Sequence, residues 1–468
     1  MKNNKNQMSQ IENKEGITSK KESLMSVYLR RFKKHKLGNI GFWILVFFYF
    51  TAIFADILSP YTMSWMNKKK AYHPPSKMYF MYKGNDKTQF KPFVYEKILT
   101  NVAFKEYKIV PQHTMRAISI EASPGKGELR SVFIDKDQAT RERKLINAIT
   151  SHYLIKENHA KIAELSNLIK KIEEQPAEDV TVIFKVGEVE VNGKIQEQKL
   201  MLVKGNKNFL SFFSRGVAYS FLNLFNSNIH FFGSDTGGYF PLGGDALGRD
   251  LLSRLLHGSR ISLSVGLIGV LISFVIGLLI GGLAGYFGGI VDTILMRFSE
   301  IMLSFPSIYL LFTLRSSLPQ GLPSTQIYLL IIMILALVGW ASLARIIRGM
   351  VLSLKNEDYV LSAKTVGLSH LKIITKHILP NTLSFIIVQA TLTIPGYILG
   401  ESALSLLGLG ITEPQSSWGN MLSVARNHRV LQNFPWVLIP GFTIFLSIMA
   451  WNFFGDGVRD AVDPKSKH

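Results

Sequence analysis

The feature that most constrains this chain is a series of long apolar runs that carry little charge. The longest, Ile261–Phe287, has 27 residues without Lys, Arg, Asp or Glu. A helix rises about 1.5 Å per residue and the hydrocarbon core of a bilayer is about 30 Å thick, so such a run can cross a membrane as one helix. Five other runs have the same character: Ile40–Leu58, Asp292–Leu314 (interrupted by Pro306), Ile327–Ile347, Thr382–Leu404 and Trp436–Phe454. The pattern predicts an all-α polytopic membrane protein with six transmembrane helices.

A charged region, residues 59–235, separates the first run from the second. Its segment Asp135–Glu174 places apolar residues at helical spacing, which predicts one or two long helices; these residues are Ile162, Leu165, Ile169 and Ile172. We expect the helices to pack on a sheet of the same domain; a coiled-coil partner site is the alternative.

Strands are predicted in the same region. Val180–Val186 alternates as a strand does, and two further segments flank Asn192-Gly193, namely Glu188–Val191 and Lys194–Val203. Asn-Gly accepts positive φ at both positions of a tight turn, so these segments predict a β-hairpin. Residues 59–235 are therefore expected to form an inserted α+β extracytoplasmic domain.

Charge placement predicts the orientation. The net charge is +20, and residues 1–39 carry ten Lys or Arg against three acidic residues, directly before the first run. Positive charge beside a first span indicates a cytoplasmic tail, and residues 25–39 have the composition of a basic amphipathic segment on the membrane surface. An even number of crossings returns the tail 456–468 to the same side. Arg249, Arg254 and Arg260 are exceptions, because this topology places them outside.

Other functional classes are disfavoured by the same composition. Nucleic-acid binding is not expected, because the positive charge adjoins a membrane segment. The chain has no cysteine and its eleven histidines are scattered, so we expect no disulfide, no metal site and no cofactor.

A short polar segment between two spans carries the most informative pattern. Residues 356–370 predict a helix of about three turns that ends near Gly367, within the cytoplasmic loop 348–380. A helix of this length suits docking into a groove of another protein; an ordinary solvated loop is the alternative. The candidate docking residues are Glu357, Asp358, Tyr359, Ser362, Ala363, Gly367, Leu368 and Pro380.

This segment resembles the cytoplasmic "EAA" loop of bacterial ABC importer permeases. Leu361-Ser362-Ala363 stands where the family has Glu-Ala-Ala, followed by Gly367 and Leu379-Pro380, so Leu361 replaces the family's Glu. Three further segments are similar to the C-type permease of the dipeptide/oligopeptide group: Gly244–Arg254 with Gly258–Leu263, Glu401–Gly410 with Ser417–Leu422, and Gly455–Pro464. The resemblance covers 240–464 well and 1–58 loosely, and it does not cover most of 59–235.

The resemblance implies a permease subunit of the bacterial inner membrane and not an enzyme. A phosphate-binding loop would end in Gly-Lys-Ser/Thr, whereas Gly125-Lys126 is followed by Gly and Gly193-Lys194 by Ile. The implied partners are two ABC ATPase subunits that grip residues 356–370, a second homologous permease, an extracytoplasmic substrate-binding protein, and membrane lipid. In this view residues 236–260 are an amphipathic segment leading into a core of five spans, residues 261–455.

Charged and small residues in the spans are further candidates. Asp292, Arg297 and Glu300 begin the third span, where we expect them to pair with one another or to line a pathway. Glu401, near the outer end of the fifth span, has either a hydrogen-bonding or a gating role. Gly277, Gly281 and Gly285 form a small-residue stripe that predicts close helix packing.

Two other functions remain open at this point. The chain could be a membrane-anchored receptor or assembly scaffold that acts through its outer domain. It could also be a secondary transporter, although that class needs ionisable groups near the membrane midplane, and the second, fourth and sixth spans offer none.

Overall fold

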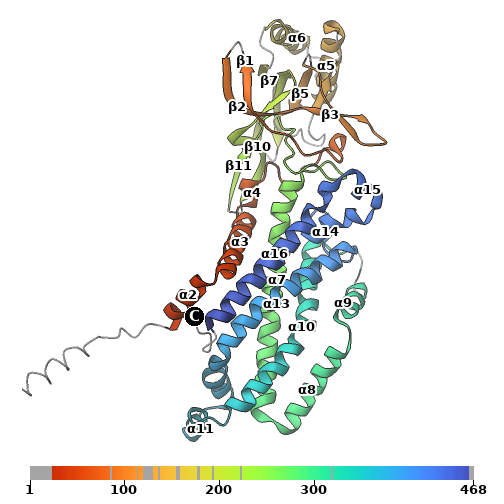
Figure 1. Ribbon diagram of the computed structural model, residues 1–468. Coiled ribbons are helices and arrows are strands. Elements are labelled where there is room, and N and C mark those ends of the chain that lie inside the picture. Colours follow the sequence, from red (N-terminus) through yellow and green to blue (C-terminus); the bar gives the residue numbers. More distant parts are fainter. Residues whose placement is uncertain are drawn as a thin grey trace, which may run out of the picture.

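The computed structural model describes residues 24–462 apart from 85–86, 113, 120–129, 135–136, 154–158, 176–179, 192–193, 222–223, 318 and 320. A tilted bundle of long helices carries a β-rich domain at one end (Figure 1). The segments that are long and apolar enough to cross a membrane are α3 (Lys36–Ile53), α7 (Leu251–Phe287), α10 (Ser324–Leu354), His370–Leu406 with α13 (Leu383–Leu406), and Pro435–Val462 with α16 (Ile439–Val462).

The third predicted span is bent. Helix α8 (Gly289–Ser304) meets α9 (Ser307–Ser316) at 89°, and Pro306 lies at the break. Proline lacks the N–H that would continue the helical ladder, which explains the break at this residue. The described chain therefore has five spans, or six if the bent pair crosses the membrane as one.

Several helix ends differ from the expected boundaries. Helix α7 begins at Leu251, where Asp250 caps it by accepting a hydrogen bond from the Ser253 N–H, so the helix includes part of the predicted lead-in 236–260. Helix α16 continues to Val462, beyond the expected end of the core at 455. The remaining helices and helical turns are α2 (Leu24–Lys34), α4 (Ala55–Leu58), α5 (Gln138–Tyr153), α6 (His159–Glu174), α11 (Asp358–Thr365), α12 (His370–Ile373), α14 (Trp418–Leu422), α15 (His428–Asn433), Lys68–Lys70, Ile374–Ile378, Leu379–Thr382, Ser423–Arg426 and Pro435–Leu438.

The inserted domain contains antiparallel strands in four small sheets, in the orders β1-β2-β9, β6-β5-β8-β7, β3-β4 and β10-β11. The strands are β1 (Tyr79–Gly84), β2 (Lys87–Tyr95), β3 (Lys97–Asn101), β4 (Glu106–Ile109), β5 (Met115–Ser119), β6 (Arg130–Phe133), β7 (Val180–Val191), β8 (Lys194–Lys204), β9 (Lys207–Phe209), β10 (Ser211–Phe221) and β11 (Phe225–Gly233).

Helices α5 and α6 pack on the four-stranded sheet and form the core of the inserted domain. Leu165, Ile169 and Ile172 are buried against Leu200 and Leu202 of β8, which confirms that the predicted helices cover a sheet of their own domain. The predicted β7–β8 hairpin is also confirmed by its pairing, whereas its Asn192-Gly193 turn lies outside the described residues, as does the predicted tail before Leu24.

The two ends of the inserted domain lie next to each other, at Ser76 and Phe240. The backbone N–H of Ser76 donates to the Phe240 carbonyl at 2.8 Å, and the Phe240 N–H donates to Ser76 Oγ at 3.0 Å. Residues 77–239 therefore begin and end side by side, as expected of a domain inserted into a loop.

Candidate functional site

The segment expected to dock another protein lies at the end of the bundle opposite the inserted domain (Figure 1). Helix α11 has eight residues, about two turns, which is shorter than the three turns expected from the sequence. It is followed by α12, a π-helical turn and a 3₁₀ turn that contains Pro380, and these lead directly into α13.

Gly367 ends α11 in a Schellman motif. Its φ of +80° lies in the left-handed region, which an L side chain rarely adopts. The Gly367 N–H donates to the Lys364 carbonyl at 3.0 Å, and the Leu368 N–H donates to the Ala363 carbonyl at 3.2 Å. Gly367 therefore sets the direction in which the chain leaves α11.

Helix α11 is packed into the bundle core by one face. Val360 is fully buried and Ala363 is 6% exposed, and both belong to the main core of the bundle. Lys364 lies 5.3 Å from the centre of the Tyr286 ring, a cation–π contact with α7.

The rest of the surface of α11 and of its C-cap is open, and it includes large apolar side chains. Tyr359 is 39% exposed, Leu361 44% and Val366 79%. The predicted residues Glu357, Asp358, Ser362, Gly367 and Pro380 are exposed as well, whereas Ala363 is buried and Leu368 half-buried. Asn381 Nδ2 donates to the Tyr359 hydroxyl at 3.1 Å and links α11 to the start of α13. A helix that the bundle holds on one side and that exposes apolar as well as polar side chains is a suitable docking element.

Glu401 is fully buried between α7, α13 and α14. Its hydrogen-bond partners in the described part of the chain are hydroxyl groups: Ser405 at 2.6 Å, Ser262 of α7 at 3.2 Å and Ser402 at 3.4 Å. Ser262 Oγ also accepts from the Trp418 N–H at 3.1 Å. The carboxyl group thus joins three helices through hydroxyl bridges.

The charged residues of α8 do not form the cluster expected from their sequence spacing. Asp292 receives two hydrogen bonds from Arg348 of α10, one of them from Nη2 at 2.5 Å, and it does not pair with Arg297 or Glu300. Arg297 and Glu300 pair with each other at 2.8 Å on an exposed face, as residues three apart on a helix can. Asp292 therefore fastens α8 to α10.

The glycine stripe of α7 faces α10. A Cβ atom on Gly277 would lie 3.0 Å from the Trp340 carbonyl, on Gly281 2.4 Å from the Ala344 carbonyl, and on Gly285 2.8 Å from the Arg348 carbonyl. At all three positions, a methyl group would lie closer to the α10 backbone than the 3.4 Å of an ordinary van der Waals contact.

The arginines that did not fit the predicted topology are neutralised at the end of the bundle near the inserted domain. Arg254 pairs with Asp245 at 2.6 Å and with Glu413 at 2.9 Å, and Arg249 pairs with the same two carboxylates. Glu413 lies in the loop between α13 and α14, so this network joins distant parts of the chain. Sequence reasoning missed the network because Glu413 is 164 residues from Arg249 and 159 from Arg254.

Arg260 has a separate carboxylate partner, Asp56 of α4, at 2.8 Å, and His257 contacts the same carboxylate at 3.1 Å. Burial alone would raise the pKa of Asp56, but hydrogen bonds from His257 and Arg260 outweigh it and lower the pKa to about 2. Asp56 is therefore a carboxylate at neutral pH and holds α4 against α7.

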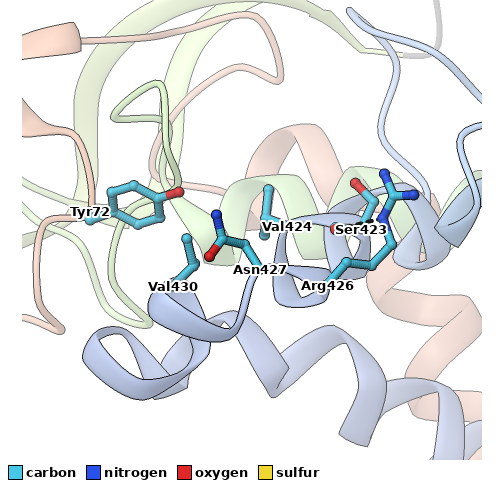
Figure 2. Close-up of a pocket in the computed structure, with 6 residues that line it drawn as sticks. All are labelled: Tyr72, Ser423, Val424, Arg426, Asn427 and Val430. Carbon is cyan, nitrogen blue, oxygen red and sulfur yellow. Dashed lines mark hydrogen bonds between the residues drawn. The ribbon is translucent and has the colours of Figure 1, made fainter.

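An open hollow of about 560 Å³ lies between Tyr72, which precedes the inserted domain, and residues 423–430 after α14 (Figure 2). Tyr72 lines one side, and the residues of the opposite side are Ser423, Val424, Arg426, Asn427 and Val430. The Tyr72 ring stacks on Phe434 at 4.2 Å, which fixes one wall of the hollow. Among the described residues, no group of three or more His, Asp or Glu side chains could hold a metal ion.

Two protein families match the sequence on either side of the inserted domain. The family described as the N-terminal TM domain of oligopeptide transport permease C matches residues 23–75. The family described as a binding-protein-dependent transport system inner membrane component matches residues 277–468. The first of these ranges ends one residue before the point where the inserted domain leaves the bundle.

Individual relatives align over about half of this chain. The oligopeptide transport system permease protein OppC of Haemophilus influenzae is 46% identical over 231 residues, which cover 49% of this chain and 72% of the relative. The dipeptide transport system permease protein DppC of Bacillus subtilis is 46% identical over 224 residues, covering 48% and 68%. The di/tripeptide transport system permease protein DppC of Pseudomonas aeruginosa is 43% identical over 230 residues, covering 49% and 73%. Among solved structures, inward-facing conformations of the MetNI methionine ABC transporter align with 45% of this chain and 96% of their own, at 20% identity and a TM-score of 0.34.

Proposed function

Since this chain belongs to the OppC/DppC-type family of binding-protein-dependent inner membrane permeases, we propose that it conducts peptides across the cytoplasmic membrane as one subunit of an ABC importer. A component of this class is not itself catalytic, and it works with an ATPase and a binding protein. In our proposal the complete assembly has two ATPases, a second homologous permease and one extracytoplasmic binding protein, embedded in membrane lipid.

The observation that carries this proposal is the open surface of α11 and its C-cap, which exposes apolar side chains at the end of the bundle. An ATPase that binds this surface would hold Leu361 and Val366, which are well exposed in the described chain. Because Val360 and Ala363 fix the opposite face in the bundle core, a movement of the ATPase would be passed to α7, α10 and α13. Leu361 replaces the family's Glu, so the expected contact is apolar at this position.

We further propose that α11 and both chain ends lie in the cytoplasm and that the inserted domain lies outside. Helix α2 supports this orientation, because its last turn carries Arg31, Lys33 and Lys34 beside the first span. The arginines near the inserted domain do not oppose it, because carboxylates neutralise Arg249, Arg254 and Arg260 in place.

Roles inside the bundle follow from the same contacts. We assign Glu401 to hydrogen bonding between helices, because hydroxyl groups surround it. We assign Asp292 to the joint between α8 and α10, and the exposed pair Arg297 and Glu300 to the membrane boundary or the pathway.

Uptake by the reconstituted assembly tests the proposal and separates it from secondary transport. Vesicles that contain the permease pair, the ATPases and the binding protein should accumulate a labelled peptide only when ATP reaches the ATPases. A control with an imposed ion gradient and no ATP should show no uptake. Uptake driven by the gradient alone would refute the proposal.

We also propose that the inserted domain receives the binding protein or guides its ligand. The hydrogen bonds between Ser76 and Phe240 hold the two ends of residues 77–239 together, so a short glycine linker can replace them. Lys70→Ala accompanies the excision, because Glu96, the buried carboxylate partner of Lys70, is removed with the domain. The excised chain should insert into the membrane normally and lose peptide uptake. Normal uptake by the excised chain would show that the domain has another role. If the intact chain binds a ligand but transports nothing, the receptor or scaffold alternative would be favoured.

A further inference from the structure

The β10–β11 hairpin ends in apolar side chains that the described residues leave uncovered. Leu224 at the turn is 77% exposed, and Phe225 at the start of β11 is 55% exposed. A two-stranded hairpin is only marginally stable by itself in water. An exposed apolar tip on such a hairpin is therefore a candidate for contact with a non-aqueous surface.

The hairpin tip lies at the end of a membrane-spanning helix. The Phe221 ring stacks on Phe54 at 5.9 Å with an interplanar angle of 23°, and Phe54 directly follows α3. Phe54 in turn lies 4.7 Å from Phe50 within α3, and Phe221 lies 5.3 Å from Phe225. A continuous series of rings thus leads from the span to the hairpin tip.

The direction of the hairpin follows from a second contact. His230, in the middle of β11, lies 2.6 Å through Nδ1 from the carbonyl oxygen of Ser59, five residues farther along the chain than Phe54. Phe221, near the hairpin tip, thus lies beside Phe54 at the end of the span, whereas His230, farther from the tip, lies beside Ser59, which is farther from the span. The hairpin therefore lies along α4 with its tip toward the membrane (Figure 1).

The depth of the tip can be estimated from α3. This helix has 18 residues and is therefore about 27 Å long, close to the thickness of the hydrocarbon core. Its end at Ile53 thus lies near the boundary between hydrocarbon and headgroups, where aromatic side chains are favoured. Trp43 and Phe47 of α3 are 66% and 61% exposed, as expected of a face that contacts lipid.

We propose that the tip of the β10–β11 hairpin, Phe221, Leu224 and Phe225, inserts into the interfacial layer of the bilayer leaflet on the side of the inserted domain. The occupant of this surface is lipid, because the ring series continues the exposed face of α3 without interruption. The insertion fastens the domain to the membrane beside the first span. This proposal applies whichever side of the membrane the inserted domain occupies and whichever solute is transported, so it does not depend on the proposed function.

Site-directed spin labelling can test the insertion in the full-length chain, because the native sequence has no cysteine. Leu224→Cys places a label at the tip. Ile183→Cys is the control: Ile183 is an aliphatic strand residue, 56% exposed, in β7 of the four-stranded sheet. Figure 1 shows β7 far from the helix bundle. Both variants are purified, labelled and reconstituted into phosphatidylcholine vesicles.

We expect the label at position 224 to collide several-fold less often with a water-soluble nickel chelate than the label at 183, and more often with oxygen, which partitions into lipid. Equal access of the chelate to both labels would overturn the proposal. Protection of position 224 from both reagents would also overturn it, because protein and not lipid would then cover the tip. Phe225→Cys gives a second, independent reading if the first variant does not fold, and the same pattern is expected there.

Discussion

The glycine stripe between α7 and α10 gives a sharp test of the helix packing. A methyl group at position 281 would lie 2.4 Å from the Ala344 carbonyl oxygen and 2.9 Å from Ile347 Cβ. An ordinary contact is at least 3.4 Å, so Gly281→Ala must move the two helices apart by about 1 Å or distort them. Overpacking of this kind costs about 1–3 kcal/mol.

The matched control is Gly349→Ala in α10, where no atom lies within 4 Å of the added Cβ. Both changes gain up to about 1 kcal/mol of helix propensity, so the control should be neutral or slightly stabilising. Because the propensity gain is common to both variants, the difference in their free energy of unfolding should be about 1–3 kcal/mol, the overpacking cost alone. Reversible unfolding in mixed micelles of a mild detergent and dodecyl sulfate, followed by circular dichroism, measures this difference. Equal stability of the two variants would refute the close approach of α7 and α10.

Three further predictions concern ionisable side chains. Glu96→Ala should destabilise the inserted domain by about 3–5 kcal/mol, because it leaves the buried cations Lys70 and Arg116 without their shared carboxylate; a smaller loss in chemical denaturation would contradict this. Burial lowers the pKa of His73 to about 3, below its unfolded value of about 6.5, so its contribution to stability is complete above pH 6.5 and is lost as the pH falls toward 3. His73→Phe should flatten the pH dependence of the melting temperature in that window, and an unchanged slope would show that other groups cause it. The double variant Asp292→Arg with Arg348→Asp reverses the ion pair and should recover much of the stability that each single change removes. If the double variant loses as much stability as the two single changes added together, the pair is not coupled.

Local patterns in the sequence predicted much of the fold. The apolar runs located the spans, the spacing of Leu165, Ile169 and Ile172 located a helix that covers the inserted sheet, and Gly367 marked the end of α11. Each of these features depends on residues a few positions apart, whose physical requirements are visible without a three-dimensional context.

Features that depend on distant partners were not predictable. Arg249 and Arg254 opposed the predicted topology until the structure placed Glu413 beside them. Asp292 was expected to pair within its own helix, whereas its partner is Arg348, 56 residues away. The exposed Leu224 indicates a membrane contact only because Phe221 of the same hairpin tip stacks on Phe54 at the end of the first span.

The central claim is that α11 docks the ATPase, and co-purification from the native membrane in mild detergent tests it most directly. Val366→Asp introduces a charge on the open surface of α11 and its C-cap, where Val366 is 79% exposed and its replacement should leave the fold intact. Val102→Asp, at a residue 69% exposed in the inserted domain, is the matched control. We predict that the tagged wild-type chain and the control recover an ATPase and a second permease, and that Val366→Asp recovers the permease without the ATPase. Equal recovery of the ATPase by all three chains would contradict the assignment of α11 as the coupling helix.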